Sequence, residues 1–123
     1  MEWGHNMGQL RIEKVQELIK QEVSKIILQE LKDPRIGFVT VTQVDVSGDL
    51  KYAKIYVSLL GSQEEVKNTW AALQSSLGYL RREIGNRIKL RCTPELSFQI
   101  DKSLDHSVHI QELLDKIKKN EAN

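Results

Sequence analysis

Residues 70–91 read WAALQSSLGYLRREIGNRIKLR and carry one apolar face across an interruption at residues 76–78. Apolar side chains keep helical spacing on both sides of it, at Val66, Trp70, Leu73, Leu77, Leu80, Ile84 and Ile88. Gly78 interrupts the pattern, and a glycine inside a helix costs about 1 kcal/mol relative to alanine. Such a glycine indicates a kink, a helix end or the close approach of another backbone. The stretch therefore predicts two helices that share a core and are separated by a kink.

The second half of this stretch is basic. It holds one carboxylate, Glu83, and five cations, Arg81, Arg82, Arg87, Lys89 and Arg91. The whole chain has a formal net charge of only +1, so a nucleic-acid contact would depend on uneven placement of charge rather than on its total. The alternative is a solvated helix face, in which Glu83 and Arg87 form an i,i+4 pair worth about 0.2–0.5 kcal/mol. Charge alone leaves both interpretations open.

Before this stretch, the sequence predicts a helix followed by a hairpin. Over residues 10–32 apolar side chains recur at three- and four-residue steps, which is typical of an amphipathic helix, and Pro34 ends it. The next segment, 38–46, is rich in β-branched residues and predicts a strand. Its even-numbered residues are expected on one face: Phe38, Thr40, Thr42, Val44 and Val46. A turn at 47–49 then leads into an antiparallel strand over 50–60, where Ala53, Ile55, Val57 and Leu59 alternate with polar residues and tyrosines.

The remaining elements follow from caps and alternation. Ser62 and Glu65 fit the capping box that begins a helix. Pro94 opens a third strand, in which Leu96, Phe98 and Ile100 share one face, and residues 105–119 predict a last helix. Residues 1–9 and 120–123 are predicted to be disordered ends, with one domain over 10–104 between them and the last helix.

This order of elements predicts an α+β fold with a three-stranded mixed sheet. The first two strands form the antiparallel hairpin, while the second and third can lie parallel because a helical layer joins them by a right-handed crossover. Helices then pack on one face of the sheet, with the kinked pair between strands two and three. A chain of 123 residues is long enough for one such core.

Composition and motifs exclude several classes of protein. The chain has no run of about 18 apolar residues and no signal-like leader, so we expect a cytoplasmic protein without a membrane span. Cys92 has no disulfide partner and is predicted to be semi-buried, and His5, His106 and His109 lack a third ligand, so no metal or cofactor is predicted. No glycine-framed nucleophile, Walker loop or dinucleotide fingerprint is present, so no catalytic site and no enzyme are predicted.

Three motifs carry a resemblance to a known family. They are DPRIG at 33–37, DLKYAKIYVS at 49–58 and LRREIGNRIKLRCTPELSF at 80–98. In this order they resemble ribosome-binding factor A, a family of bacterial assembly factors of the small ribosomal subunit with a type II KH-like fold. The resemblance covers almost all of the chain.

The resemblance implies a function. It implies binding to the small (30S) ribosomal subunit or its precursor through 16S rRNA, late maturation and 5′-end processing of that RNA, and a role in cold adaptation. The function is non-enzymatic, and a ribosome-associated GTPase is a further partner to consider. In the family the GxxG loop of ordinary KH domains is replaced by a kink of alanine, any residue and glycine, which matches Ser76, Leu77 and Gly78 here. Serine departs from that pattern, and its hydroxyl could cap the second helix or bond back to an earlier carbonyl.

The predicted RNA-binding residues surround this kink: Ser76, Gly78, Arg81, Arg82, Arg87, Lys89 and Arg91. Arginine suits the role because its planar guanidinium can pair with two phosphate oxygens or stack on a base. Trp70 has core spacing and is not expected to stack on bases. Tyr52 and Tyr56 share a strand face that either contacts bases or packs beneath a helix, and the sequence leaves this open.

A rival interpretation assigns the chain to another class. It could be a protein-interaction or dimerisation module without RNA binding, using an exposed sheet edge or the last helix, with the basic stretch merely solvated. For the assembly factor, we expect a monomer.

Overall fold

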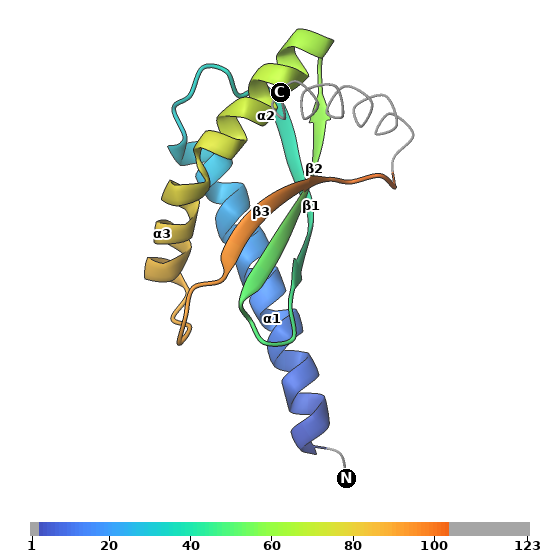
Figure 1. Cartoon of the computed structure of the whole chain (residues 1–123), viewed down its shortest axis with the longest axis vertical. Helices are drawn as coiled ribbons and strands as arrows, with labels where there is room; N and C mark the ends of the chain where they lie inside the picture. The colour runs from blue at the N-terminus through green and yellow to red at the C-terminus, as the bar shows by residue number, and fades with distance from the viewer. Residues whose placement is uncertain (1–2, 104–123) are drawn as a thin grey trace, which may run out of the picture.

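The structure, a computed structural model, describes residues 3–103 and, from residue 11 onward, their side chains. Helix α1 (Trp3–Lys25) continues into the π-helical turn η1 (Ile26–Glu30), followed by β1 (Phe38–Val46), β2 (Tyr52–Leu60), α2 (Gln63–Ser75), α3 (Leu77–Arg87) and β3 (Glu95–Ile100) (Figure 1). The predicted order is confirmed across these elements. The helix predicted over 105–119 and the tail predicted over 120–123 lie outside the described residues.

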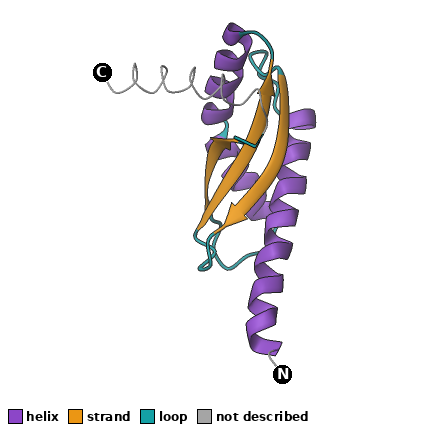
Figure 2. Ribbon diagram, turned by 90° about the vertical axis from the view of Figure 1, so that its right-hand side faces the viewer, coloured by secondary structure: helices purple, strands orange, loops and turns teal. Residues whose placement is uncertain are grey.

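The three strands form one mixed sheet in the order β1-β2-β3. Strands β1 and β2 are antiparallel, with Val46 opposite Ala53, and β2 and β3 are parallel, with Ala53 opposite Leu96. The connection from β2 to β3 passes through α2 and α3, as a parallel pair requires. In Figure 2 the strands are turned to the viewer and the helices lie behind and beside them. The predicted α+β class and the type II KH-like arrangement are confirmed.

The core lies between this sheet and the helices. Side chains that are almost fully buried come from every layer, among them Ile19, Val23, Ile55, Val57, Leu73, Leu80 and Ile84. Each such side chain contributes about 1.5–3 kcal/mol relative to an exposed one. Trp70 is 7% exposed and belongs to this cluster, so its assignment to the core is confirmed. None of the helices in residues 3–103 has the length and apolar character needed to cross a bilayer.

The predicted face of β1 is wrong for its first half. Val41, Val44 and Val46 are buried, whereas Phe38 is 75% exposed and Thr40 is also exposed. The pairing register with β2 shifts between Val41 and Gln43, because Thr42 is an extra residue on the β1 side. One extra residue reverses the alternation along the strand. Odd-numbered Val41 therefore faces the core before the bulge, and even-numbered Val44 and Val46 face it afterwards.

The first helix also differs from its predicted bounds. It begins at Trp3, seven residues before the predicted start, so residues 3–9 of the predicted disordered end continue α1. Extending a helix from a packed turn adds one hydrogen bond per residue, whereas only the first turn is costly. At the other end, the Leu31 N–H donates to the carbonyl of Ile26 at 2.9 Å, which closes the wider η1 turn.

Candidate nucleic-acid interface

The kink between α2 and α3 consists of Ser76. Its N–H donates to the carbonyls of Ala72 and Leu73, both at 3.1 Å, and its own carbonyl accepts from the Leu80 N–H at 2.9 Å. The Ser76 hydroxyl donates to the Leu73 carbonyl at 2.7 Å and does not cap α3. The bond back to an earlier carbonyl is therefore the role that the hydroxyl takes. Ser76 is 9% exposed, so it shapes the kink from inside the protein.

Beyond the kink, a shallow groove of about 570 Å³ runs along α3. We call it the α3 groove, and it is lined by Gly78, Arg81, Arg82, Gly85, Asn86 and Thr93. All but the last come from one side of α3, and Thr93 comes from the segment that leads into β3. The structure thus brings together three of the predicted site residues, Gly78, Arg81 and Arg82.

The two glycines of the α3 groove have different surroundings. A Cβ added at Gly78 would meet no atom within 4 Å, so no internal packing requires glycine there. The exposed backbone at Gly78 is instead open to a molecule outside the protein. A Cβ at Gly85 would lie 2.7 Å from Oγ1 of Thr93, so Gly85 lets α3 approach the segment before β3.

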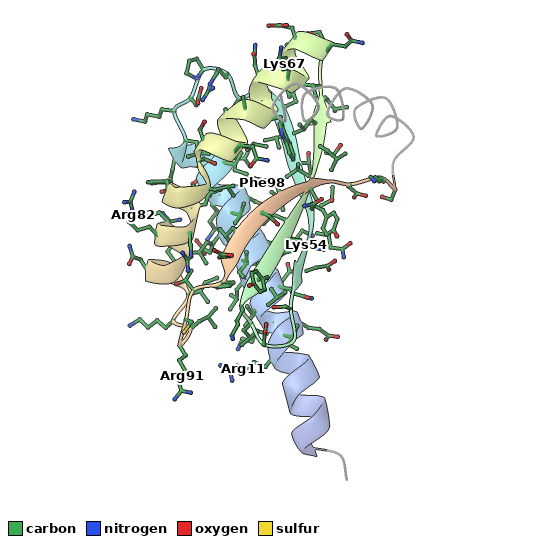
Figure 3. The ribbon with its side chains drawn as sticks, viewed as in Figure 1. Arg11, Lys54, Lys67, Arg82, Arg91 and Phe98 are labelled. Atoms are coloured by element: carbon green, nitrogen blue, oxygen red, sulfur yellow. The ribbon has the colours of Figure 1, made fainter. Side chains whose placement is uncertain are left out.

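The two arginines of the α3 groove are available to an anion. Arg81 is exposed, and one of its guanidinium nitrogens donates to the Thr93 carbonyl at 3.3 Å. The Arg82 guanidinium lies 5.8 Å from the ring centre of Tyr79, and its side chain projects away from the body of the protein (Figure 3). Neither arginine forms an ion pair with any side chain in residues 11–103. A guanidinium held at the surface by a neutral contact keeps its charge and most of its donors for a ligand.

Arg87 lies in a different environment, which we call the Arg87 cluster: Glu22, Glu30, Tyr79, Glu83 and Arg87. Arg87 is 2.6 Å from Glu30, 3.1 Å from Glu83 and 3.3 Å from Glu22, and the Tyr79 hydroxyl donates to Glu30 at 3.1 Å. The hydrogen bond from Arg87 lowers the pKa of Glu30, and burial raises the pKa of Tyr79. The structure therefore places Arg87 in an ion-pair network that joins α1, η1 and α3, apart from the α3 groove.

The other predicted cations lie after α3. Lys89 and Arg91 are exposed, and Arg91 lies beside a second groove rather than the first. Cys92 is exposed, so the prediction of a semi-buried cysteine is wrong. It follows α3 in a surface segment whose next residues, Thr93 and Pro94, turn inward instead.

The sheet face opposite the helices carries the two tyrosines of β2. Tyr52 is 56% exposed and Tyr56 is partly exposed. None of the helices in residues 3–103 covers this face (Figure 2), so of the two alternatives for the tyrosines, packing beneath one of these helices is ruled out. Within the same part of the chain, no three His, Cys, Asp or Glu side chains converge as metal ligands.

Sequence reasoning missed Gly85, Asn86 and Thr93 as lining residues. One signal was present, since Gly85 follows Gly78 by seven residues and two helical turns place both on one face. Thr93 had no such signal, because its place beside α3 depends on how the chain returns to the sheet.

Three comparisons with known proteins find similar sequences and a similar fold. The family profile "Ribosome-binding factor A" matches residues 11–114. A ribosome-binding factor A of Clostridium tetani is 51% identical over 116 residues, which cover 94% of this chain and 96% of the relative.

The crystal structure of ribosome-binding factor A from Thermus thermophilus shares the fold, with a TM-score of 0.63 and 24% identity over 72% of this chain and 94% of the other. A homology model of the Thermus thermophilus protein, fitted into a cryo-electron microscopy map of a complex with the 30S subunit, matches with a TM-score of 0.54 and 26% identity over 68% of this chain and 88% of the other.

Proposed function

Because the chain belongs to the ribosome-binding factor A family, we propose that it binds the small ribosomal subunit or its precursor through 16S rRNA, using the α3 groove. The observation that carries the proposal is the pairing of Arg81 and Arg82, which form no ion pair with the side chains of residues 11–103, with the open backbone of Gly78. The 30S complex of the related Thermus thermophilus protein supports the choice of partner.

The chemistry of the α3 groove fits phosphate. Without a GxxG loop, the sugar-phosphate chain has no glycine-rich loop to lie against, so side-chain charge must supply more of the affinity. Arg81 and Arg82 lie in the middle of α3, where both line the groove and can meet phosphate oxygens. Such contacts position the protein on RNA and carry little sequence information, so specificity would come from the shape of the RNA.

The proposed action requires no catalysis. The protein would favour a late precursor conformation by binding it more tightly than the finished subunit, since a ligand with equal affinity for both shifts nothing. Assistance to 5′-end processing of 16S rRNA, the role in cold adaptation, a cytoplasmic location and release by a ribosome-associated GTPase all belong to this proposal through the family.

Co-sedimentation with purified small and large subunits at low and moderate salt tests the proposal. The test variant is Arg81→Ala with Arg82→Ala, and the matched control is Lys54→Ala with Lys67→Ala, which removes two exposed cations elsewhere (Figure 3). We expect selective binding of wild type and control to the small subunit. Losing two phosphate contacts should weaken binding by the test variant and make the negative slope of log affinity against log salt shallower by about 1.4–1.8.

Two results would count against the proposal in different ways. If the test variant and the control sediment equally with small subunits, the α3 groove is not the binding surface. If the wild type shows no preference for small subunits at either salt concentration, the ribosomal function itself is wrong for this chain.

A further inference from the structure

A second groove, of about 430 Å³, lies beside the first. Three cations from segments far apart in the sequence line it: Arg11 from α1, Lys51 from the turn between β1 and β2, and Arg91 from the segment between α3 and β3. Figure 3 shows Arg11 and Arg91 at the same end of the molecule. We call this site the Arg11 groove.

We propose that the Arg11 groove binds the sugar-phosphate backbone of the same RNA strand that the α3 groove holds. The proposal rests on the proposed function. The two grooves are contiguous along the chain, because Arg91 and Cys92 line one and Thr93 lines the other. In this proposal, an RNA strand that leaves the α3 groove past Thr93 meets Cys92 and Arg91 of the Arg11 groove next.

The charges in the Arg11 groove favour a polyanion. None of its three cations forms an ion pair with a side chain in residues 11–103. The one carboxylate, Asp49, accepts through Oδ1 from the Ser47 hydroxyl at 2.6 Å and from the Lys51 N–H at 3.1 Å, so this oxygen is engaged within the turn. Three cations against one engaged carboxylate contrast with the formal charge of +1 on the whole chain.

The frame of the Arg11 groove is fixed before any ligand arrives. Leu50 has φ of 60°, an uncommon value for a side chain with a Cβ, and the Leu50 N–H donates to the Ser47 carbonyl at 2.9 Å. The Lys51 carbonyl accepts from the N–H of Glu95 at 2.8 Å, which ties the turn to the start of β3. A strained residue held by its surroundings is often found at a binding site, and here Leu50 directly precedes Lys51 in the lining of the groove.

The apolar part of the lining suits a nucleotide strand. Leu50 and Leu90 are partly buried, pack against the core and line the Arg11 groove beside the cations. Ribose and base edges need such apolar contact, while phosphates need the cations. An acidic protein segment would meet the same charges, but only RNA also explains the continuity with the α3 groove.

The test exploits Cys92, which is the only cysteine of the chain and lines the Arg11 groove. Iodoacetamide, a neutral reagent, is used to alkylate Cys92 in the wild-type protein, alone, with a single-stranded oligouridylate and with small subunits. Affinity for the fluorescent oligouridylate is measured by anisotropy across a salt series. The variant is Arg11→Ala, Lys51→Ala and Arg91→Ala, and the matched control is Lys32→Ala, Lys54→Ala and Lys67→Ala, which removes three exposed cations elsewhere.

We expect both RNA and small subunits to slow alkylation of Cys92 several-fold. Removing three phosphate contacts should make the negative slope of log affinity against log salt shallower by about 2, at roughly 0.7 per contact on a single strand, while the control keeps the wild-type slope. Folding of both variants is checked by circular dichroism, and the alkylation result on wild type stands even if a variant is destabilised.

The proposal is overturned if Cys92 reacts at the same rate with and without bound RNA, or if the variant and the control share one slope. It is also overturned if small subunits protect Cys92 but RNA that binds the α3 groove does not, because the occupant would then be a ribosomal protein. Failure of the proposed function is distinguishable, since in that case the wild type binds neither RNA nor small subunits.

Discussion

Arg81 and Arg87 lie six residues apart on α3, yet their surroundings assign them different roles. Arg87 contacts three carboxylates, the nearest at 2.6 Å, whereas Arg81 donates to the neutral Thr93 carbonyl at 3.3 Å. A guanidinium that already satisfies several carboxylates would have to give up those bonds to meet phosphate. We therefore propose Arg81 and Arg82 as RNA contacts and leave Arg87 as the residue that positions α3.

Gly78 and Gly85 provide a test at the same scale. Gly78→Ala should raise the free energy of unfolding by up to about 1 kcal/mol, because the added Cβ meets nothing and alanine favours the helix. It should nevertheless weaken RNA binding if RNA approaches the backbone there. Gly85→Ala should lower stability by up to about 2 kcal/mol, since overpacking against Thr93 outweighs the gain in helix propensity. Urea unfolding and RNA anisotropy measure the two effects.

The control for Gly85→Ala is a substitution of Thr93, the residue that the added Cβ would meet. In a Thr93→Ala background the contact at 2.7 Å is absent, so Gly85→Ala should become neutral or stabilising. A Gly78→Ala variant that gains stability and keeps full RNA affinity would contradict the close approach of RNA at that residue.

At the scale of elements, the Arg87 cluster joins three helical segments that are far apart in the sequence. The π-helical turn η1 carries Glu30, which reaches both Arg87 and the Tyr79 hydroxyl of α3. The wider turn exposes Leu28 while keeping Ile26 and Ile27 buried. The last residue of the π-helical turn, Glu30, thus belongs to the ion-pair network that joins η1 to α3.

Because Glu30 takes part in this network, stability should depend on pH in a predictable way. The bond from Arg87 lowers the pKa of Glu30 from its ordinary 4.5, so its stabilising contribution is complete above that value and is lost as pH falls through the lowered pKa. The Glu30→Gln variant should therefore be less stable than wild type at pH 7. The difference should shrink as the solution is acidified, which urea unfolding at a series of pH values measures.

Glu95→Gln removes an exposed carboxylate outside the Arg87 cluster and serves as the control. Its difference from wild type should not follow the Glu30 pattern. Hydrogen bonds from the side chain and backbone of Arg35 lower the pKa of Asp33 to about 2. All three proteins therefore lose the same stability at low pH through Asp33, and this loss cancels in the comparison. A Glu30→Gln curve that runs parallel to wild type at every pH would show that the bond to Arg87 does not contribute.

At the scale of the whole molecule, charged and apolar surfaces lie on different elements. The two basic grooves border α3 and the segment after it, while the exposed apolar side chains Leu28, Phe38 and Leu60 lie on η1 and the hairpin. Strand β1 is an edge of the sheet and could in principle pair with another chain, as a dimerisation module would require. Its bulge at Thr42 and its polar residues around that point disfavour such pairing.

We therefore expect a monomer. Sedimentation velocity from low to high micromolar concentration should give one species of constant mass, and Phe38→Lys should leave that mass unchanged because Phe38 is 75% exposed and a lysine there removes no core contact. A dimer that forms with concentration and dissociates in the Phe38→Lys variant would favour the protein-interaction alternative. The variant with Arg81→Ala and Arg82→Ala distinguishes this outcome, since it alters only α3 and leaves the hairpin unchanged.

Most of the fold could be predicted from periodicity and caps. Alternation in β2 and β3, the helical spacing around Trp70 and the capping box of Ser62 with Glu65 all agree with the structure. These signals are local, since burial of one face imposes its period directly on the sequence. The bulge at Thr42 escaped prediction because one extra residue changes the pairing with β2 without changing the composition of β1.

For this protein, the sequence by itself determined the elements, their order and the place where basic residues concentrate. Only the tertiary structure decided which of those cations are available, because Arg87 loses its freedom to carboxylates from residues 22 and 30, and Arg91 gains the company of Arg11 and Lys51. Pairing of charges depends on distances of a few ångströms between segments that are remote in the chain. Periodicity does not encode those distances. The packing of α1 and α3 against the sheet, of which the hairpin is part, fixes them.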